Sequence, residues 1–150
     1  MALTTIGHAA LPTGSILQVV QLTKTASFVA TANQDNDVTG LTNLQITPKF
    51  SNSKVLVSLN VVCLVANPSD CNFKILRGST EIWLGNYYSS GLDNNDYIPF
   101  TVAAEYLDSP NSTSQLTYKL TVNHDANDLY VNYTNEINSI ATFTAKEIRG

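Results

Sequence analysis

The chain has 150 residues, eight of them basic and twelve acidic, so its formal net charge is −4. With only 13% charged residues, it offers no broad positive field, which excludes a protein that binds nucleic acid or anionic lipid through charge. A chain of this length buries its apolar residues around one core. Threonine, serine and asparagine supply 46 residues, a composition typical of strands joined by polar turns. We therefore expect a single all-β domain.

The N-terminal segment, MALTTIGHAALPTG, lacks the basic region and the continuous apolar core of a secretory signal peptide. The longest apolar run covers residues 55–66 and is interrupted by Ser58 and Asn60. This run is too short and too polar to span a membrane as a helix. We expect neither export by a signal peptide nor insertion into a membrane.

Alternating apolar and polar residues, bounded by Gly, Pro, Asn, Asp and Ser, predict about ten short strands. They cover residues 15–21, 26–32, 38–46, 54–65, 72–76, 80–84, 97–106, 115–122, 129–134 and 140–148. The strand over 54–65 has apolar residues on both faces, so we expect it to be central and nearly buried on both sides. Strands 72–76 and 80–84 form a hairpin with a short loop, and residues 86–96 form a long loop.

Ten short strands without an alignable repeat predict a two-sheet β-sandwich or jelly roll rather than a propeller or a solenoid. Strand periodicity alone does not choose the topology.

Two cysteines, Cys63 and Cys71, specify neither a zinc site nor a disulfide framework. One interpretation is a disulfide between them. The other is that Cys63 is a small buried hydrophobic residue on a strand and Cys71 is a thiol in a loop. Neither interpretation bears on function.

Motifs of catalysis are not evident in this sequence. The histidines, His8 in the N-terminal segment and His124 in a turn, do not belong to a nucleophile motif, and the sequence contains no GxSxG, Walker, GxGxxG or HExxH pattern. Asp93 and Asp96 lie in the long loop, where a solvated turn is the commoner role. We expect no enzymatic activity and assign no catalytic residues.

The segment DNDVTG, residues 35–40, begins like a calcium-binding loop. Thr39 occupies the fifth position and Ile46 stands where a bidentate Glu is needed. A β-turn is therefore the favoured interpretation, and the segment NHDAND at 123–128 is an equally weak candidate. We predict no metal site and no cofactor.

Aromatic and polar residues gather around the long loop, where they are candidates for recognition. Aromatic faces stack on sugars, and Asn and Asp offer directional hydrogen bonds to a ligand rich in hydroxyl groups. The alternative is that tyrosines at strand ends cap the core or fill a subunit interface. The candidate ligand-binding residues are Trp83, Tyr87, Tyr88, Asp93 and Tyr97.

Five segments in order carry a resemblance to a known family. They are PTGSILQVVQLTKT, DVTGLTNLQITPKFSNSKVLVSLNV, FKILRGSTEIWLG, EYLDSPNSTSQLTYKLTV and SIATFTAKEI. From about Pro12 to Ile148, the chain resembles the C-terminal jelly-roll domains of bacteriophage tail fibres and related virion proteins, including head decoration proteins.

The resemblance implies a jelly-roll β-sandwich, similar to the tumour necrosis factor and C1q folds, that associates as a homotrimer. It implies no catalytic residues. Arg77 and Thr80 match the family's hairpin, and we expect them to organise the turn or an interface. Strands that are apolar on both faces are compatible with a trimer, since a neighbouring subunit can cover them.

We expect residues 1–14 to form a docking arm and residues 15–150 to form the jelly-roll domain. The arm would contact the major capsid protein or another virion component through Ala2, Leu3, Ile6, Leu11 and Pro12. Because no shaft or attachment module precedes the first family strand, we expect a trimeric decoration or cement protein on the capsid, made in the host bacterial cytoplasm. The alternatives are a tail-fibre or head-fibre tip that binds a host receptor or surface polysaccharide and, less favoured, a glycan depolymerase.

Overall fold

The computed structural model describes residues 7–66, 69–89, 97–125, 128–133 and 139–150. These residues contain one short 3₁₀-helix, η1 (His8–Ala10), and eleven strands. The strands are β1 (Ile16–Lys24), β2 (Phe28–Ala30), β3 (Asn36–Asp37), β4 (Leu44–Ile46), β5 (Lys54–Ala66), β6 (Ser69–Arg77), β7 (Thr80–Ser89), β8 (Tyr97–Asp108), β9 (Leu116–His124), β10 (Leu129–Val131) and β11 (Ala141–Ile148). The all-β prediction is confirmed.

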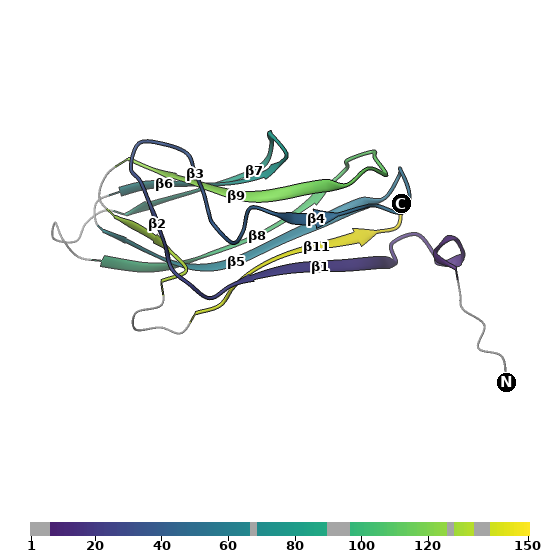
Figure 1. The fold of residues 1–150 in the computed structure, drawn as a ribbon, viewed down its shortest axis with the longest axis horizontal. Coiled ribbons are helices and arrows are strands. Elements are labelled where there is room, and N and C mark those ends of the chain that lie inside the picture. Colours follow the sequence, from purple (N-terminus) through teal and green to yellow (C-terminus); the bar gives the residue numbers. More distant parts are fainter. Residues whose placement is uncertain (1–6, 67–68, 90–96, 126–127, 134–138) are drawn as a thin grey trace.

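The strands form two antiparallel sheets that pack face to face (Figure 1). In sheet A, β1 pairs with β11, β11 with β5, and β5 with β8. Further along β5, the strands β10 and β2 take the places of β11 and β1. In sheet B, β3 and β4 pair with successive parts of β9, which pairs with β6, and β6 pairs with β7.

The strand order is that of a jelly roll. If β1 with β2, β3 with β4, and β10 with β11 are each counted as one interrupted strand, sheet A has the order first, eighth, third, sixth, and sheet B has the order second, seventh, fourth, fifth. The chain changes sheet at every connection except the β6–β7 hairpin. Pairing of eight strand positions in this way defines the double-sheet jelly roll, so the predicted fold class is confirmed.

The hydrophobic core lies between the sheets, and β5 shows how the sequence builds it. Odd-numbered residues from Val55 to Val65 are buried, whereas even-numbered residues from Leu56 to Leu64 are half-buried or exposed. Phe73, Tyr118 and Phe143 are the largest fully buried side chains. The expectation that β5 is nearly buried on both sides is therefore wrong for the single chain, because nothing in the described residues covers its outward face.

The predicted strand over residues 38–46 is broken in the structure. Val38 and Leu41 close a turn in which the Leu41 N–H donates to the Val38 carbonyl over 2.8 Å. Gly40 has a φ of +91°, a conformation that residues with a Cβ rarely adopt. The apolar residues Val38, Leu41, Leu44 and Ile46 do not alternate strictly, and only β4 remains as a strand there.

The predicted β6–β7 hairpin is confirmed, with Arg77 paired to Thr80 and Gly78 at a φ of +58°. Strand β7 is longer than predicted, since it continues to Ser89. Asn86, Tyr87 and Tyr88 are therefore strand residues, and their assignment to a loop was wrong. The remainder of the predicted loop, residues 90–96, lies outside the described residues.

A buried polar cluster joins the two sheets where β6 and β8 end. The Arg77 Nη1 contacts both Asp108 carboxylate oxygens, at 2.6 and 2.7 Å, and the Tyr118 hydroxyl donates to Asp108 Oδ2 over 2.7 Å. Asp108 belongs to sheet A, whereas Arg77 and Tyr118 are partners in sheet B. Burial, with the hydrogen bond to Asp108, raises the pKa of Tyr118 far above its usual value, so the phenol stays a donor. Arg77 thus links sheet B to sheet A, and its expected role in organising the turn or an interface stays a prediction.

The two ends of the sandwich differ (Figure 1). At one end, Ile16 of β1 pairs with Ile148 of β11, so the first and last strands lie together. At the other end, Ala66 of β5 pairs with Tyr97 of β8. The thirteen residues of β5 place these ends about 40 Å apart, and they are termed the terminal end and the distal end. None of the described helical residues forms a segment long and apolar enough to cross a bilayer.

Candidate functional site

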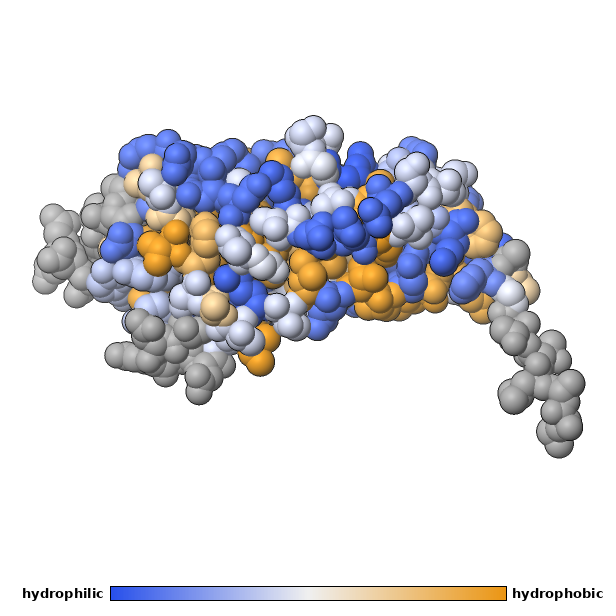
Figure 2. All heavy atoms as spheres, in the orientation of Figure 1, coloured by the Kyte–Doolittle hydropathy of each residue, from blue (hydrophilic) through white to orange (hydrophobic). Residues whose placement is uncertain are grey.

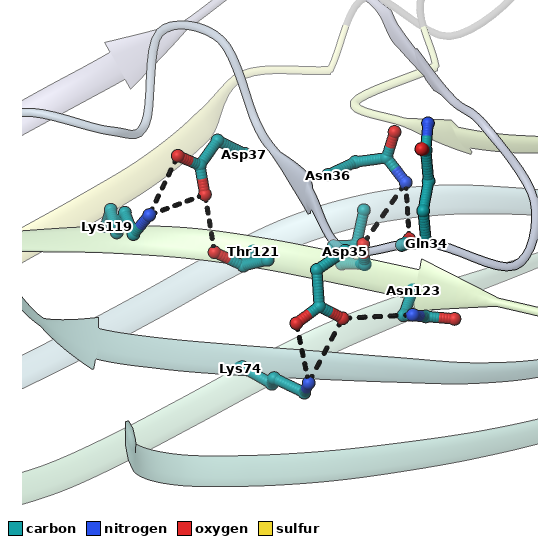
Figure 3. Close-up of polar contacts among 9 residues, drawn as sticks. Gln34, Asp35, Asn36, Asp37, Lys74, Lys119, Thr121 and Asn123 are labelled. Carbon is teal, nitrogen blue, oxygen red and sulfur yellow. Dashed lines mark hydrogen bonds and ion pairs between the residues drawn. The ribbon is translucent and has the colours of Figure 1, made fainter. Parts of the chain in front are cut away.

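The outward face of sheet B is charged and internally paired (Figure 3). Lys74 Nζ lies 2.9 Å from Asp35 Oδ2, and Lys119 Nζ lies 2.8 Å from Asp37 Oδ2. Hydrogen bonding by Asn123 and Lys74 lowers the pKa of Asp35, and hydrogen bonding by Lys119 lowers the pKa of Asp37. These carboxylates of the segment DNDVTG are therefore used in ion pairs. Among the described residues, no three His, Cys, Asp or Glu side chains are grouped to hold a metal ion.

The outward face of sheet A is poor in charge over the half in which β11 pairs with β5. Alternation along β1, β11, β5 and β8 sends small hydroxyl, amide and aliphatic side chains to this side. This surface is termed the β1–β11 face. Its residues are Val19, Gln21, Thr23, Lys54, Leu56, Ser58, Asn60, Ala103, Glu105, Leu107, Thr142, Thr144, Lys146 and Ile148. Figure 2 shows hydrophilic side chains mainly along the upper, sheet B side and hydrophobic ones in the middle of the molecule and along the lower side, near β1.

The middle of the β1–β11 face is hollowed. Small side chains, including Ser58, Ala103 and Thr142, line a depression of about 370 Å³. At its edge, the Ser58 hydroxyl donates to Glu105 Oε1 over 3.0 Å. Towards the terminal end, Val19 and Leu107 are each more than half exposed. Exposed aliphatic side chains beside a recess with few charges are typical of the centre of a protein interface.

The predicted ligand-binding residues do not form one site. Trp83 and Tyr87 point between the sheets at the edge formed by β7 and β8, where they line a cavity of about 200 Å³. Tyr87 stacks on Phe100 with ring centroids 3.8 Å apart. Tyr88 points to the opposite side of β7 and is 67% exposed. The structure brings Trp83 and Tyr87 together but separates them from Tyr88, because successive strand residues face opposite ways.

The indole of Trp83 occupies the space over Gly85. A Cβ at position 85 would overlap Trp83 at Cη2, so Gly85→Ala must displace the ring. We expect tryptophan emission to move to longer wavelength, since Trp83 is the chain's one tryptophan, with a loss of about 1–3 kcal/mol of stability. Gly7→Ala, where a Cβ meets nothing within 4 Å, is the control. Unchanged emission from Gly85→Ala would contradict this packing.

The other predicted aromatic residue, Tyr97, joins two tyrosines that sequence reasoning missed. Tyr97 and Tyr130 have ring centroids 6.0 Å apart, and Tyr130 and Tyr133 have centroids 5.5 Å apart, both in edge-to-face geometry. The three rings and Leu64 line a cavity of about 190 Å³ at the distal end. The register of β10 on β5, which opposes Tyr130 to Leu64, and the pairing of β8 with β5, which places Tyr97 opposite Ala66, bring these residues together. Asp93 lies outside the described residues.

The predicted docking residues Ala2, Leu3 and Ile6 also lie outside the described residues. In the described part of the arm, Leu11 is half-buried and Pro12 is exposed. Arg149 holds this part, because its Nη1 donates to the His8 carbonyl over 3.3 Å and its carbonyl accepts from the Gly14 N–H over 2.8 Å. Residues 8–14 thus pack on the C-terminal end of their own chain, and docking of the arm stays a prediction.

Both cysteines are free and buried. Cys71 lies within β6, so its assignment to a loop was wrong, whereas burial of Cys63 is confirmed. Burial raises the pKa of Cys63 strongly and that of Cys71 to about 11, so both thiols stay protonated at neutral pH. His124 is buried, with Nε2 3.2 Å from the Ala30 carbonyl oxygen, and His8 is exposed in the arm.

The sequence matches no protein-family model and no curated protein. Solved structures of infectious bursal disease virus are similar in fold. The Gx strain structure has a TM-score of 0.45 at 12% identity, and the Gt strain structure has a TM-score of 0.41 at 13% identity, each over 99% of this chain and 41% of that chain. A VP2 subviral particle has a TM-score of 0.36 at 13% identity, over 99% and 42%. The chain thus spans about two fifths of those proteins, and TM-scores this low carry no weight in assigning its function.

Proposed function

We propose that this chain is a nonenzymatic structural protein of a bacteriophage virion, where it forms a homotrimer that decorates the capsid. The observation that carries the proposal is the β1–β11 face, a hollowed surface with few charges on a protein whose other sheet carries the ion pairs Lys74–Asp35 and Lys119–Asp37. The family resemblance supports the assignment of this chain to a virion and the threefold symmetry of the proposed trimer. The proposal assigns no catalytic residues.

Self-association explains the difference between the two sheets. Lys54, Glu105 and Lys146 are the charged residues of the β1–β11 face, and Glu105 accepts a hydrogen bond from Ser58. A surface of this kind loses little solvation of charge when a second copy covers it. A contact through sheet B would instead bury Asp35, Asp37 and their lysines, and removing these charges from water costs free energy. We therefore assign the subunit contacts to the β1–β11 face.

The arrangement of the chain ends supports attachment at the terminal end. The 3₁₀-helix η1 and Arg149 lie together there, so a threefold assembly would direct three arms to the same side. Such a trimer could contact the capsid through its arms and face outward with its distal end. The second candidate function, a fibre tip that binds a host receptor, is favoured by the tyrosine cavity at the distal end.

Quantitative mass spectrometry of purified virions tests the virion assignment. The ratio of this chain to the major capsid protein and to the portal distinguishes a position on the capsid surface from a position at a fibre tip. We expect hundreds of copies, as for a protein spread over the head. A small multiple of three would favour the fibre tip instead, and absence of the chain from purified virions would contradict the proposal.

A single substitution in the hollow tests the proposed contact surface. Ala103 is exposed on β8 opposite Asn60, so Ala103→Glu leaves the core intact but places a second carboxylate beside Glu105. We expect self-association to weaken by at least about a hundredfold, because like charges in an interface cost several kcal/mol. Sedimentation at matched chain concentrations measures this effect. Ser79→Glu, at the exposed β6–β7 turn, is the control, and an unchanged mass for Ala103→Glu would place the contact elsewhere.

A further inference from the structure

We infer that the tyrosine cavity at the distal end is a saccharide-binding subsite, which holds one sugar ring of a host-surface polysaccharide. Its residues are Leu64, Tyr97, Tyr130 and Tyr133, with Asp128 beside it. This site goes beyond the proposed structural role, and it does not depend on where in the virion the trimer lies.

The rings form a preorganised apolar surface. Tyr130 lies between the other two tyrosines, and both neighbours pack against it edge to face. Leu64 on β5 lies directly opposite Tyr130 on β10, so the middle of the cluster is fixed by the sheet. Tyr97 is 49% exposed, which leaves part of its ring accessible. Aromatic rings held in this way pack against the C–H face of a sugar ring with little loss of side-chain entropy.

Polar groups at the edge of the cavity suit the hydroxyl groups of a sugar. The Tyr130 hydroxyl donates to Asp128 Oδ2 over a long 3.3 Å, and a carboxylate can accept several hydrogen bonds. Desolvation and the nearby Asp128 charge raise the pKa of Tyr130, so its phenol remains protonated. A donor and an acceptor therefore lie next to an aromatic surface, as a small-molecule site requires.

The size and charge of the cavity disfavour other occupants. A volume of about 190 Å³ leaves room for a small ring but not for a helix or a strand. No lysine or arginine is among the described residues that line the cavity, so this lining does not fit a phosphate or another anion. A second copy of the chain is the remaining alternative. The cluster lies where β10 and β2 replace β11 and β1, outside the β1–β11 face.

Saturation-transfer NMR with the methyl glycosides of glucose, galactose, N-acetylglucosamine and rhamnose, together with an array of bacterial surface polysaccharides, tests the site. We expect the unmodified protein to bind at least one of these probes. Tyr97→Ala and Tyr130→Ala should each weaken that binding by at least about tenfold, and Asp128→Asn should weaken it measurably. Tyr88→Ala removes an exposed tyrosine from sheet B and should bind as the unmodified protein does.

Two results would overturn the inference: no binding of any probe by the unmodified protein, or undiminished binding by both tyrosine variants. Sedimentation of the same samples distinguishes loss of the saccharide subsite from loss of the trimer. A trimer that binds no sugar removes the subsite but keeps the proposed assembly. If Tyr97→Ala instead lowers the assembled mass and no probe binds, the cluster is a contact between copies, and the saccharide site is wrong.

Discussion

Asp108→Ala should destabilise the protein by about 3–5 kcal/mol, since it leaves a buried cluster without its acceptor. The Asp108 side chain is 6% exposed and that of Arg77 is 27% exposed. Removal of the carboxylate leaves the Arg77 guanidinium without its ion pair and the Tyr118 hydroxyl without the hydrogen bond that it donates. Because these groups join the two sheets, the loss affects the whole sandwich. Urea unfolding measures the change.

Asp35→Ala is the matched control, because it also removes one aspartate from one ion pair. The Asp35 side chain is 51% exposed on sheet B, so its pairing with Lys74 should be worth less than about 1 kcal/mol. All samples are compared at one chain concentration, since association contributes to apparent stability. If the Asp108→Ala variant lies within about 1 kcal/mol of the unmodified protein, the cluster does not hold the sheets together.

Glu147→Ala should cost about 2–4 kcal/mol, the second large effect that we expect. The Glu147 side chain is fully buried, and its oxygens accept hydrogen bonds from the Lys49 backbone N–H and from the Gln18 side chain, both over 2.6 Å. The substitution leaves the Lys49 N–H without this acceptor, in addition to the cavity that it creates.

Glu147→Gln keeps one acceptor oxygen at the same site, so we expect it to lose less stability than Glu147→Ala. Glu81→Ala, at an exposed position of β7, should change stability by no more than about 0.5 kcal/mol. Thermal and urea unfolding of the three variants provide the comparison. Equal losses for Glu147→Ala and Glu81→Ala would show that Glu147 has no structural role.

The strands were largely predictable because their signal is local. Tyr118, Leu120 and Val122 are buried in the core, and the segment 116–122 lies within β9 as expected, although Thr121 on the other side is also buried. The alternation fails as a guide where the backbone turns, as at Gly40. It also fails where polar residues continue a strand, as at Asn86 in β7. A polar residue on the outward side of an edge strand has the same composition as a loop residue.

The candidate site was less predictable, because it depends on contacts distant in sequence. The aromatic residues around residue 86 were identified, but strand geometry places Tyr87 and Tyr88 on opposite sides of β7. Recognition of β7 as a continuous strand would have separated them. Tyr130 joins Tyr97 only through the pairing of both β10 and β8 with β5. The sheet order comes from long-range pairing that no local pattern specifies.

The buried cluster at Asp108 illustrates the same limit. Arg77 was expected at the turn of the hairpin, and its pairing with Thr80 is confirmed. Its acceptor lies 31 residues further along the chain, in the other sheet. No spacing in the sequence distinguishes Asp108 from an aspartate in a turn, so its role becomes visible only when the two sheets are packed.

Sedimentation equilibrium of the unmodified protein at micromolar concentration tests the central claim most directly, since the proposed function depends on assembly through the β1–β11 face. Three copies of a 16.3 kDa chain predict a mass of about 49 kDa. A mass of 16.3 kDa at every concentration measured would contradict the account, because the β1–β11 face would then remain exposed to solvent.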